Sequence, residues 1–156
     1  MSNETDIDLQ NDTETTEDVS AVNQVTEDEY QKAKAAGITK ITTLVATYSH
    51  MTAELTVEYW WTNGGGTLRA YTLQYRVTSN GNNSGNITFA INGHGGQSWK
   101  NELTRSAIQD GKWHPIANGG WVGSPLMKGD LYFHYVFDRS NTGDWPTSTR
   151  EYVAYP

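Results

Sequence analysis

From residue 38 to residue 156, apolar and polar side chains alternate with a period of two, and glycine-rich segments interrupt the alternation. In residues 54–61, for example, Leu55 and Val57 share one face of an extended strand and Glu54 lies on the other. No helical pattern separates these segments, which disfavours parallel strands because parallel strands need long crossover connections. Residues 38–156 are therefore predicted to form an all-β domain, an antiparallel β-sandwich or jelly roll.

The alternation predicts about seven or eight strands. Asn63-Gly64-Gly65-Gly66 indicates a hairpin turn between the strands at 54–61 and 68–78. Residues 99–108 fit either a strand or a short helical turn. Further strands are predicted at 40–48, 87–91, 131–137 and 150–155, with long glycine-rich loops at 79–85, 92–98, 117–125 and 138–149.

The N-terminal segment differs from the rest of the chain in charge. Its first 29 residues contain ten acidic residues and no Lys or Arg, so the rest carries +3 although the whole chain carries −7. Residues 1–25 have few large apolar side chains and no aromatic ring, so burial cannot offset their ordering entropy. We predict a disordered acidic tail at 1–25, which acts either as a solubilising segment or as a docking segment for a basic partner.

One short helix is predicted within residues 26–37. Thr26 and Glu29 have the spacing of a capping box, in which each side chain accepts the backbone N–H of the other. Gly37 is a natural C-terminal stop. A helix of this length is marginal alone, so we expect its Tyr30 side to dock on the β domain.

Aromatic residues are concentrated in the predicted β domain. The chain has six Trp, nine Tyr and three Phe, and Tyr30 is the one aromatic residue before Tyr48. Rings on the apolar strand faces are predicted to fill the core. Trp60 lies on the charged face of its strand, and the other Trp residues outside the core pattern adjoin loops, where binding residues collect on β scaffolds. An exposed Trp gives a sugar a flat apolar surface, while nearby amides and carboxylates bind the hydroxyls.

Residues 92–99 form the most unusual stretch, in which three glycines surround His94. Glycines let a backbone approach a ligand closely, and the alternative is a loose connector. The predicted ligand-binding residues are Trp60, Asn92, His94, Gln97, Trp99, Trp113, Trp121, Asp144 and Trp145. The alternative for each loop Trp is that it plugs an end of the sandwich.

No cofactor or metal is predicted, with one weak alternative. Asp138, Ser140 and Thr142 are spaced like the first half of a calcium loop, but Thr149 stands where such a loop has Glu. The segment also fits an Asx-type turn at a strand end. The four histidines lack the spacing of a zinc site.

The sequence carries no motif that indicates an enzyme. It has no cysteine, which excludes a thiolate nucleophile and disulfides, and it has no nucleophile elbow, P-loop or dinucleotide fingerprint. Lectins, carbohydrate-binding modules and small toxins use aromatic-rich sandwiches of this general type, an analogy of architecture alone. We therefore predict a non-catalytic binding module that recognises a glycan through its loop aromatics.

Two alternatives remain open. Clustered Trp and Tyr suit a lipid interface, which would make the protein a membrane-active β protein such as a toxin component. Exposed strand edges and the acidic tail suit self-association in a structural or assembly subunit. Nucleic acid is disfavoured as a partner because the +3 of residues 30–156 is spread thinly. The sequence shows no signal peptide or membrane-spanning run, so a cytoplasmic location or release by a non-classical route is expected.

Overall fold

The structure is a computed structural model that describes residues 17–140 and 143–156. Residues 1–16, which make up most of the predicted tail, lie outside the described residues. The elements are β1 Glu17–Asp18, α1 Glu27–Ala35, β2 Lys40–Tyr48, β3 Met51–Thr62, the 3-10 turn η2 Asn63–Gly65, β4 Thr67–Val77, β5 Gly85–Gly93, β6 Gln97–Ala107, β7 His114–Gly123, β8 Lys128–Phe137 and β9 Trp145–Ala154.

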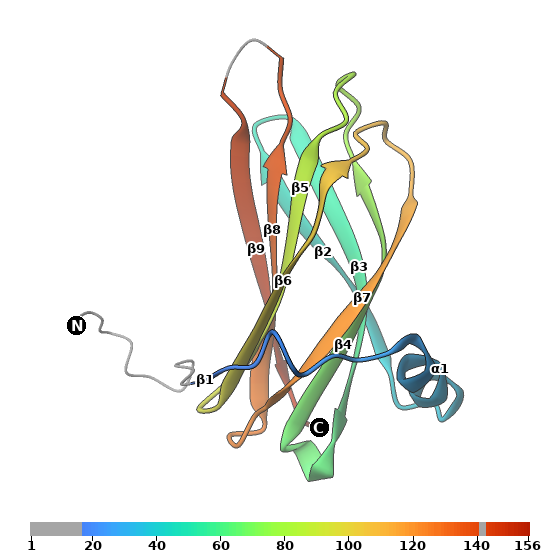
Figure 1. The fold of residues 1–156 in the computed structure, drawn as a ribbon, viewed down its shortest axis with the longest axis vertical. Coiled ribbons are helices and arrows are strands. Elements are labelled where there is room, and N and C mark those ends of the chain that lie inside the picture. Colours follow the sequence, from blue (N-terminus) through green and yellow to red (C-terminus); the bar gives the residue numbers. More distant parts are fainter. Residues whose placement is uncertain (1–16, 141–142) are drawn as a thin grey trace, which may run out of the picture.

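Two sheets face each other in a sandwich (Figure 1). The strand order is β1-β6-β5-β8-β9 in one sheet and β2-β3-β4-β7 in the other. Among the described strands, β1 pairs with β6 in parallel and every other pairing is antiparallel. The predicted all-β sandwich is confirmed, and no helix in the described part of the chain is long and apolar enough to cross a membrane.

The core lies between the two sheets. On β5 and β8 the residues predicted to face inward are all buried, and their rings and branched side chains interlock across the sandwich. These residues are Ile87, Phe89, Ile91, Leu131, Phe133, Tyr135 and Phe137, each 0% exposed. The period-two pattern therefore predicted this part of the core correctly.

Strand β4 departs from the predicted alternation. The sequence assigned Tyr71 and Tyr75 to the same inner face, but the register of β4 against β3 and β7 shifts near Thr72. A β-bulge adds one residue to a strand and turns the following side chains to the opposite face. Tyr75 consequently lies in the core between the sheets, whereas Tyr71 packs on the outer face with α1.

Helix α1 forms as predicted and covers the outer face of the β2-β3-β4-β7 sheet. The capping box is present, with the Glu29 N–H donating to Thr26 Oγ1 at 3.1 Å. Tyr30 stacks on Tyr71 at 4.6 Å between ring centroids, and its hydroxyl donates to Glu58 Oε2 at 2.5 Å. Burial and this contact with Glu58 raise the pKa of Tyr30, so its hydroxyl remains a donor across the working pH range.

Trp60 lies beneath this helix, which corrects the prediction that it is exposed. Its side chain is 3% exposed and forms a second core cluster with Val25, Tyr30, Ala33 and Tyr71. The charged face of β3 looked like a solvent face in the sequence because the pattern of one strand does not show what packs on it. Because Trp60 is buried under α1, it does not present an open ring face on the surface as the sequence predicted.

Residues 17–25 cross from one sheet to the other, although the sequence predicted a disordered tail up to residue 25. The Val19 N–H donates to the Ser98 carbonyl on β6 at 2.8 Å, and the Val25 N–H donates to the Gly119 carbonyl on β7 at 3.0 Å. Val19 and Val25 are buried. This segment, which we call the N-terminal strap, closes the seam between β6 and β7 (Figure 1).

The opposite seam is closed by the edge strands β2 and β9. Thr42 Oγ1 donates to Glu151 Oε1 at 2.6 Å, and Thr147 Oγ1 donates to the Thr47 carbonyl at 2.6 Å. The two edges therefore bond to each other through side chains as well as packing together.

Residues 117–123 belong to strand β7, which corrects the predicted loop at 117–125. Its glycines serve close packing: a Cβ on Gly120 would lie 2.2 Å from Cε2 of Trp99. Trp99 lies on β6, resolves the ambiguity of residues 99–108 in favour of a strand, and is 0% exposed. The strand therefore passes over the face of a core indole at a distance that only glycine permits.

We expect Gly120→Ala to lower the free energy of unfolding by about 1–3 kcal/mol, because the added methyl group overpacks the core against Trp99. Gly143→Ala is the matched control, since a Cβ there meets nothing within 4 Å. Urea denaturation of both variants measures the difference. Equal stability of the two variants would contradict the packing account.

We expect Tyr30→Phe to destabilise the protein by about 1–3 kcal/mol, because it leaves the buried Glu58 carboxylate without one of its donors. The phenyl ring keeps the stack on Tyr71, so the loss isolates the hydrogen bond. Denaturant midpoints report the change. A midpoint identical to that of the parent protein would show that this bond does not hold α1 in place.

Candidate functional site

The loops gather at the two ends of the sandwich. One end carries the β2–β3, β4–β5, β6–β7 and β8–β9 connections, and the other carries the β3–β4, β5–β6 and β7–β8 connections (Figure 1). Trp113, Asp144 and Trp145 belong to the first end, whereas Asn92, His94 and Gln97 belong to the second. The predicted site residues therefore do not form one surface.

The segment 92–99 is a tight β5–β6 hairpin, and its side chains bond within the protein. His94 is 4% exposed, and its Nε2 lies 3.2 Å from Oδ2 of the buried Asp130. Asn92 Nδ2 donates to Asp130 Oδ1 at 2.8 Å, and Gln97 Oε1 accepts the Gly123 N–H at 2.7 Å. These polar groups tie strands together, which corrects their assignment to an open binding loop.

The glycines of this hairpin also have a packing reason. A Cβ on Gly93 would lie 2.2 Å from the Gly123 carbonyl oxygen, and one on Gly96 would lie 2.3 Å from the same oxygen. The backbone approaches another strand here, rather than leaving room for a ligand. Trp99, at the end of the segment, is part of the core.

Three of the partly exposed Trp residues, Trp113, Trp121 and Trp145, share one feature, which is an arginine over the ring. The guanidinium carbon of Arg76 lies 4.5 Å from the Trp113 ring centroid, and that of Arg69 lies 5.2 Å from the Trp121 ring. Arg139 lies over Trp145 at 3.3 Å. Cation–π contacts of this kind stabilise exposed rings and occupy the face that a sugar would use.

Trp145 has both faces covered. Tyr48 stacks on it at 4.5 Å between centroids with an interplanar angle of 18°, while Arg139 lies at 3.3 Å. Two groups this close to one centroid would collide on the same side, so they occupy opposite faces. The indole thus serves as a rigid wall that holds the Arg139 guanidinium flat.

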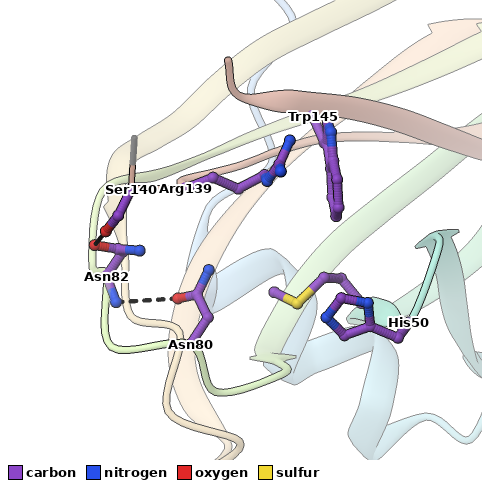
Figure 2. Close-up of a pocket in the computed structure, with 7 residues that line it drawn as sticks. His50, Asn80, Asn82, Arg139, Ser140 and Trp145 are labelled. Atoms are coloured by element: carbon purple, nitrogen blue, oxygen red, sulfur yellow. Dashed lines mark hydrogen bonds between the residues drawn. The ribbon is translucent and has the colours of Figure 1, made fainter. Parts of the chain in front are cut away.

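A polar cavity of about 230 Å³ lies beside this stack, and we call it the end pocket (Figure 2). It is lined by His50, Met51, Asn80, Asn82, Arg139, Ser140 and Trp145. These residues come from the β2–β3, β4–β5 and β8–β9 connections and the strand ends beside them. In Figure 2 the Arg139 guanidinium lies next to the Trp145 ring, with Asn82 and Ser140 across from it and His50 on a third side.

Hydrogen bonds between the loops fix the polar wall of the end pocket. Asn80 Nδ2 donates to the Asp138 carbonyl at 2.7 Å, and Asn80 Oδ1 accepts from the Asn82 N–H at 3.0 Å and from Gln109 Nε2 at 2.7 Å. Ser140 Oγ donates to Asn82 Oδ1 at 2.9 Å. Asn80 is therefore a positioning residue. Asn82 lines the cavity, and its amide nitrogen donates no hydrogen bond to another residue in the described part of the chain.

The two acids beside the end pocket accept hydrogen bonds from loop backbone N–H groups. Asp138 Oδ2 accepts the Ser84 N–H at 3.0 Å, and Asp144 Oδ1 accepts the Arg139 N–H at 3.2 Å. The first bond joins the β8–β9 connection to the β4–β5 connection, and the second closes the β8–β9 connection on itself. Thr142 of the predicted calcium pattern lies outside the described residues, and residues 17–140 and 143–156 contain no group of three or more His, Asp or Glu side chains that could hold a metal ion. Calcium binding stays an untested alternative to the prediction of no metal.

The charged side chains near Trp113 bond to one another. Asp110 Oδ1 lies 2.9 Å from His114 Nε2, and this hydrogen bond holds the pKa of the Asp110 carboxyl below its usual range. Arg76 bonds to Glu54 at 2.7 Å while covering Trp113. Trp113 remains 37% exposed at the same end of the sandwich as the end pocket.

The opposite end of the molecule is more apolar. Leu126 and Met127 of the β7–β8 turn are 45% and 47% exposed, and Tyr155 and Ile38 are 43% and 49% exposed. Tyr155 joins this group through a backbone bond to Met127 and an edge contact with Trp61. A cavity of about 250 Å³ adjoins them and is lined by Ile38, Lys40, Tyr59, Trp60, Trp61, Tyr155 and Pro156.

Sequence reasoning found Trp145 and missed most of the end pocket. The sequence singled out Ser140 only as part of a calcium pattern and Arg139 not at all, and it assigned Asn80 and Asn82 to a loop without a binding role. The density of Asn in residues 80–83 was the available signal, because Asn both builds turns and offers amides to ligands. Comparison of the chain with protein-family models, with curated proteins and with solved structures gives no match.

Proposed function

We propose that this protein is a non-catalytic binding module that recognises glycans, with the end pocket as its ligand site. The observation that carries the proposal is the convergence of polar side chains from three connections on one cavity at the end of a rigid sandwich. Binding sites on β scaffolds are commonly built from loops in this way. The cavity is smaller than the roughly 300–1,000 Å³ of drug-sized sites, so it suits one sugar residue of a longer chain.

Recognition in this site depends on hydrogen bonds more than on ring stacking. Both faces of Trp145 are covered by the protein itself, so its edge and Met51 supply the apolar part of the wall. The Asn82 amide and the Arg139 guanidinium supply donors for sugar oxygens. The neighbouring carboxylates of Asp138 and Asp144 are engaged by backbone N–H groups, which supports binding rather than acid–base chemistry.

Screening the full chain on a glycan array and titrating the best ligand by calorimetry tests this proposal. We expect Asn82→Ala to weaken binding about tenfold, the equivalent of one lost hydrogen bond to the ligand. Asn86→Ala is the matched control, because Asn86 lies on β5 outside the end pocket. Silence across neutral and acidic sugars, or equal affinity of the two variants, would overturn the proposal.

Binding to a lipid surface is a second candidate function, supported by the opposite end of the molecule. Leu126, Met127 and Tyr155 present neighbouring apolar side chains there, and Lys40 lines the adjoining cavity. Tyrosine and apolar side chains beside lysine are typical of surfaces that rest in a lipid interface. Self-association through strand edges has less support, because the chain's own segments occupy both seams of the sandwich.

Sedimentation with phosphatidylcholine vesicles tests the second candidate. If this end enters the interface, Leu126→Asn lowers the bound fraction several-fold, since burying a leucine is worth about 1.5–3 kcal/mol. Val45→Asn is the control, because Val45 is equally exposed, at 46%, on the edge strand β2. Parent protein that stays in the supernatant with these vesicles would exclude this function.

A further inference from the structure

We infer that the end pocket selects glycans that carry a carboxylate, such as a uronic acid residue, and that Arg139 binds this group. The inference rests on the proposed glycan-binding function and names the class of sugar. Three features bear on it: the edge of the Arg139 guanidinium is available to a ligand, the cavity wall offers hydrogen-bond donors, and two carboxylates lie nearby.

The stack on Trp145 leaves the Arg139 donors available. A guanidinium is planar, and its N–H groups point outward in the plane, so stacking occupies its faces and not its edge. Among the described residues, its side chain makes one hydrogen bond, from Nη1 to the Gly143 carbonyl at 3.0 Å. The remaining donors of its fork match the two oxygens of a carboxylate, which arginine binds through parallel, charge-assisted bonds.

The rigidity of this arrangement adds to its affinity for an anion. Arg139 lies between the Trp145 ring and the turn carbonyl of Gly143, and Tyr48 supports the far face of the indole. A side chain held in this way loses less conformational entropy on binding than a free surface arginine.

A second hydrogen-bond donor beside Arg139 comes from the asparagines of the cavity wall. Asn80 has its oxygen and its amide nitrogen engaged by protein groups, and Asn82 Oδ1 accepts the Ser140 hydroxyl. The Asn82 amide nitrogen thus joins the Arg139 fork as a second donor facing the cavity. An ionised carboxylate accepts hydrogen bonds and donates none, so it matches this wall better than a hydroxyl does.

Asp138 and Asp144 oppose an anion by their charge. Each is already bonded to a backbone N–H, from Ser84 and Arg139 respectively, so each has a structural reason to be present. The charge of Asp144 beside Arg139 lowers the affinity for a negative ligand without blocking it. Neutralising this acid should therefore change the affinities for acidic and neutral sugars differently.

The test compares two oligosaccharides that differ only in one group, a uronic acid and its reduced, neutral counterpart, titrated into the full chain at low salt. We expect the acidic sugar to bind about tenfold more tightly, a gain typical of a charge-assisted pair. Arg139→Lys should remove most of this preference because lysine cannot form the planar fork. Arg105→Gln, at an exposed arginine paired with Glu102 on β6, should leave it unchanged.

Whereas Arg139→Lys weakens the binding of the acidic sugar, Asp144→Asn is expected to strengthen it. It keeps an oxygen to accept the Arg139 N–H and removes the charge, so we expect the acidic sugar to bind roughly two- to threefold more tightly. Binding of the neutral sugar should not change. Thermal unfolding of each variant confirms that the loops keep their parent stability.

The possible failures are distinguishable. Equal affinity for the acidic and neutral sugars would overturn the carboxylate inference and leave the glycan-binding proposal standing. Inorganic phosphate or a sulfated sugar that competes as strongly as the uronic acid would overturn it in favour of a general anion site. Absence of binding to any sugar would overturn both.

Discussion

The space between the two sheets constrains this molecule more than any other feature. Facing sheets in a sandwich lie about 10 Å apart, and side chains from both inner faces must fill that gap. Here the largest fully buried side chains include Trp99, Phe89 and Phe133, and the ring of Trp99 reaches the backbone of β7 at Gly120. A ring this large fits only because the facing strand carries glycine where it passes. The order of strands, the closure of the seams and the placing of the loops all depend on this packing.

The N-terminal strap and α1 cover one seam and one outer face that the two sheets leave exposed. The strap bonds to β6 and β7 where these strands belong to different sheets, and α1 then covers the outer face of β3 and β4. Tyr30 anchors α1 to both strands, because its ring stacks on Tyr71 of β4 and its hydroxyl donates a hydrogen bond to the buried carboxylate of Glu58 on β3. Buried carboxylates are costly unless they are hydrogen-bonded, so this contact accounts for an acid at a covered position.

The surplus aromatic rings have a different role from the one that their number suggests. Trp60 and Trp99 are buried, and Trp113, Trp121 and Trp145 each carry an arginine on one face. These stacks order arginine side chains on the surface, and at Trp145 the ordered guanidinium borders a cavity. The chemistry of this surface therefore lies in the edges of arginines and amides, and the indoles act as supports.

The sequence by itself determined the class of fold, the capped helix, the hairpin at η2 and the inner faces of β5 and β8, because periodicity, capping and turn chemistry are local. It could not determine that α1 buries Trp60, that a bulge places Tyr71 and Tyr75 on opposite faces, or that glycines in 92–99 and 117–123 serve close packing contacts. The sequence also could not reveal the end pocket, because Asn82 and Arg139 are far apart in the chain and line one cavity only when three connections converge. Such contacts between distant segments were decided by the packing of the sheets, which places loops of unrelated sequence at the same end of the sandwich.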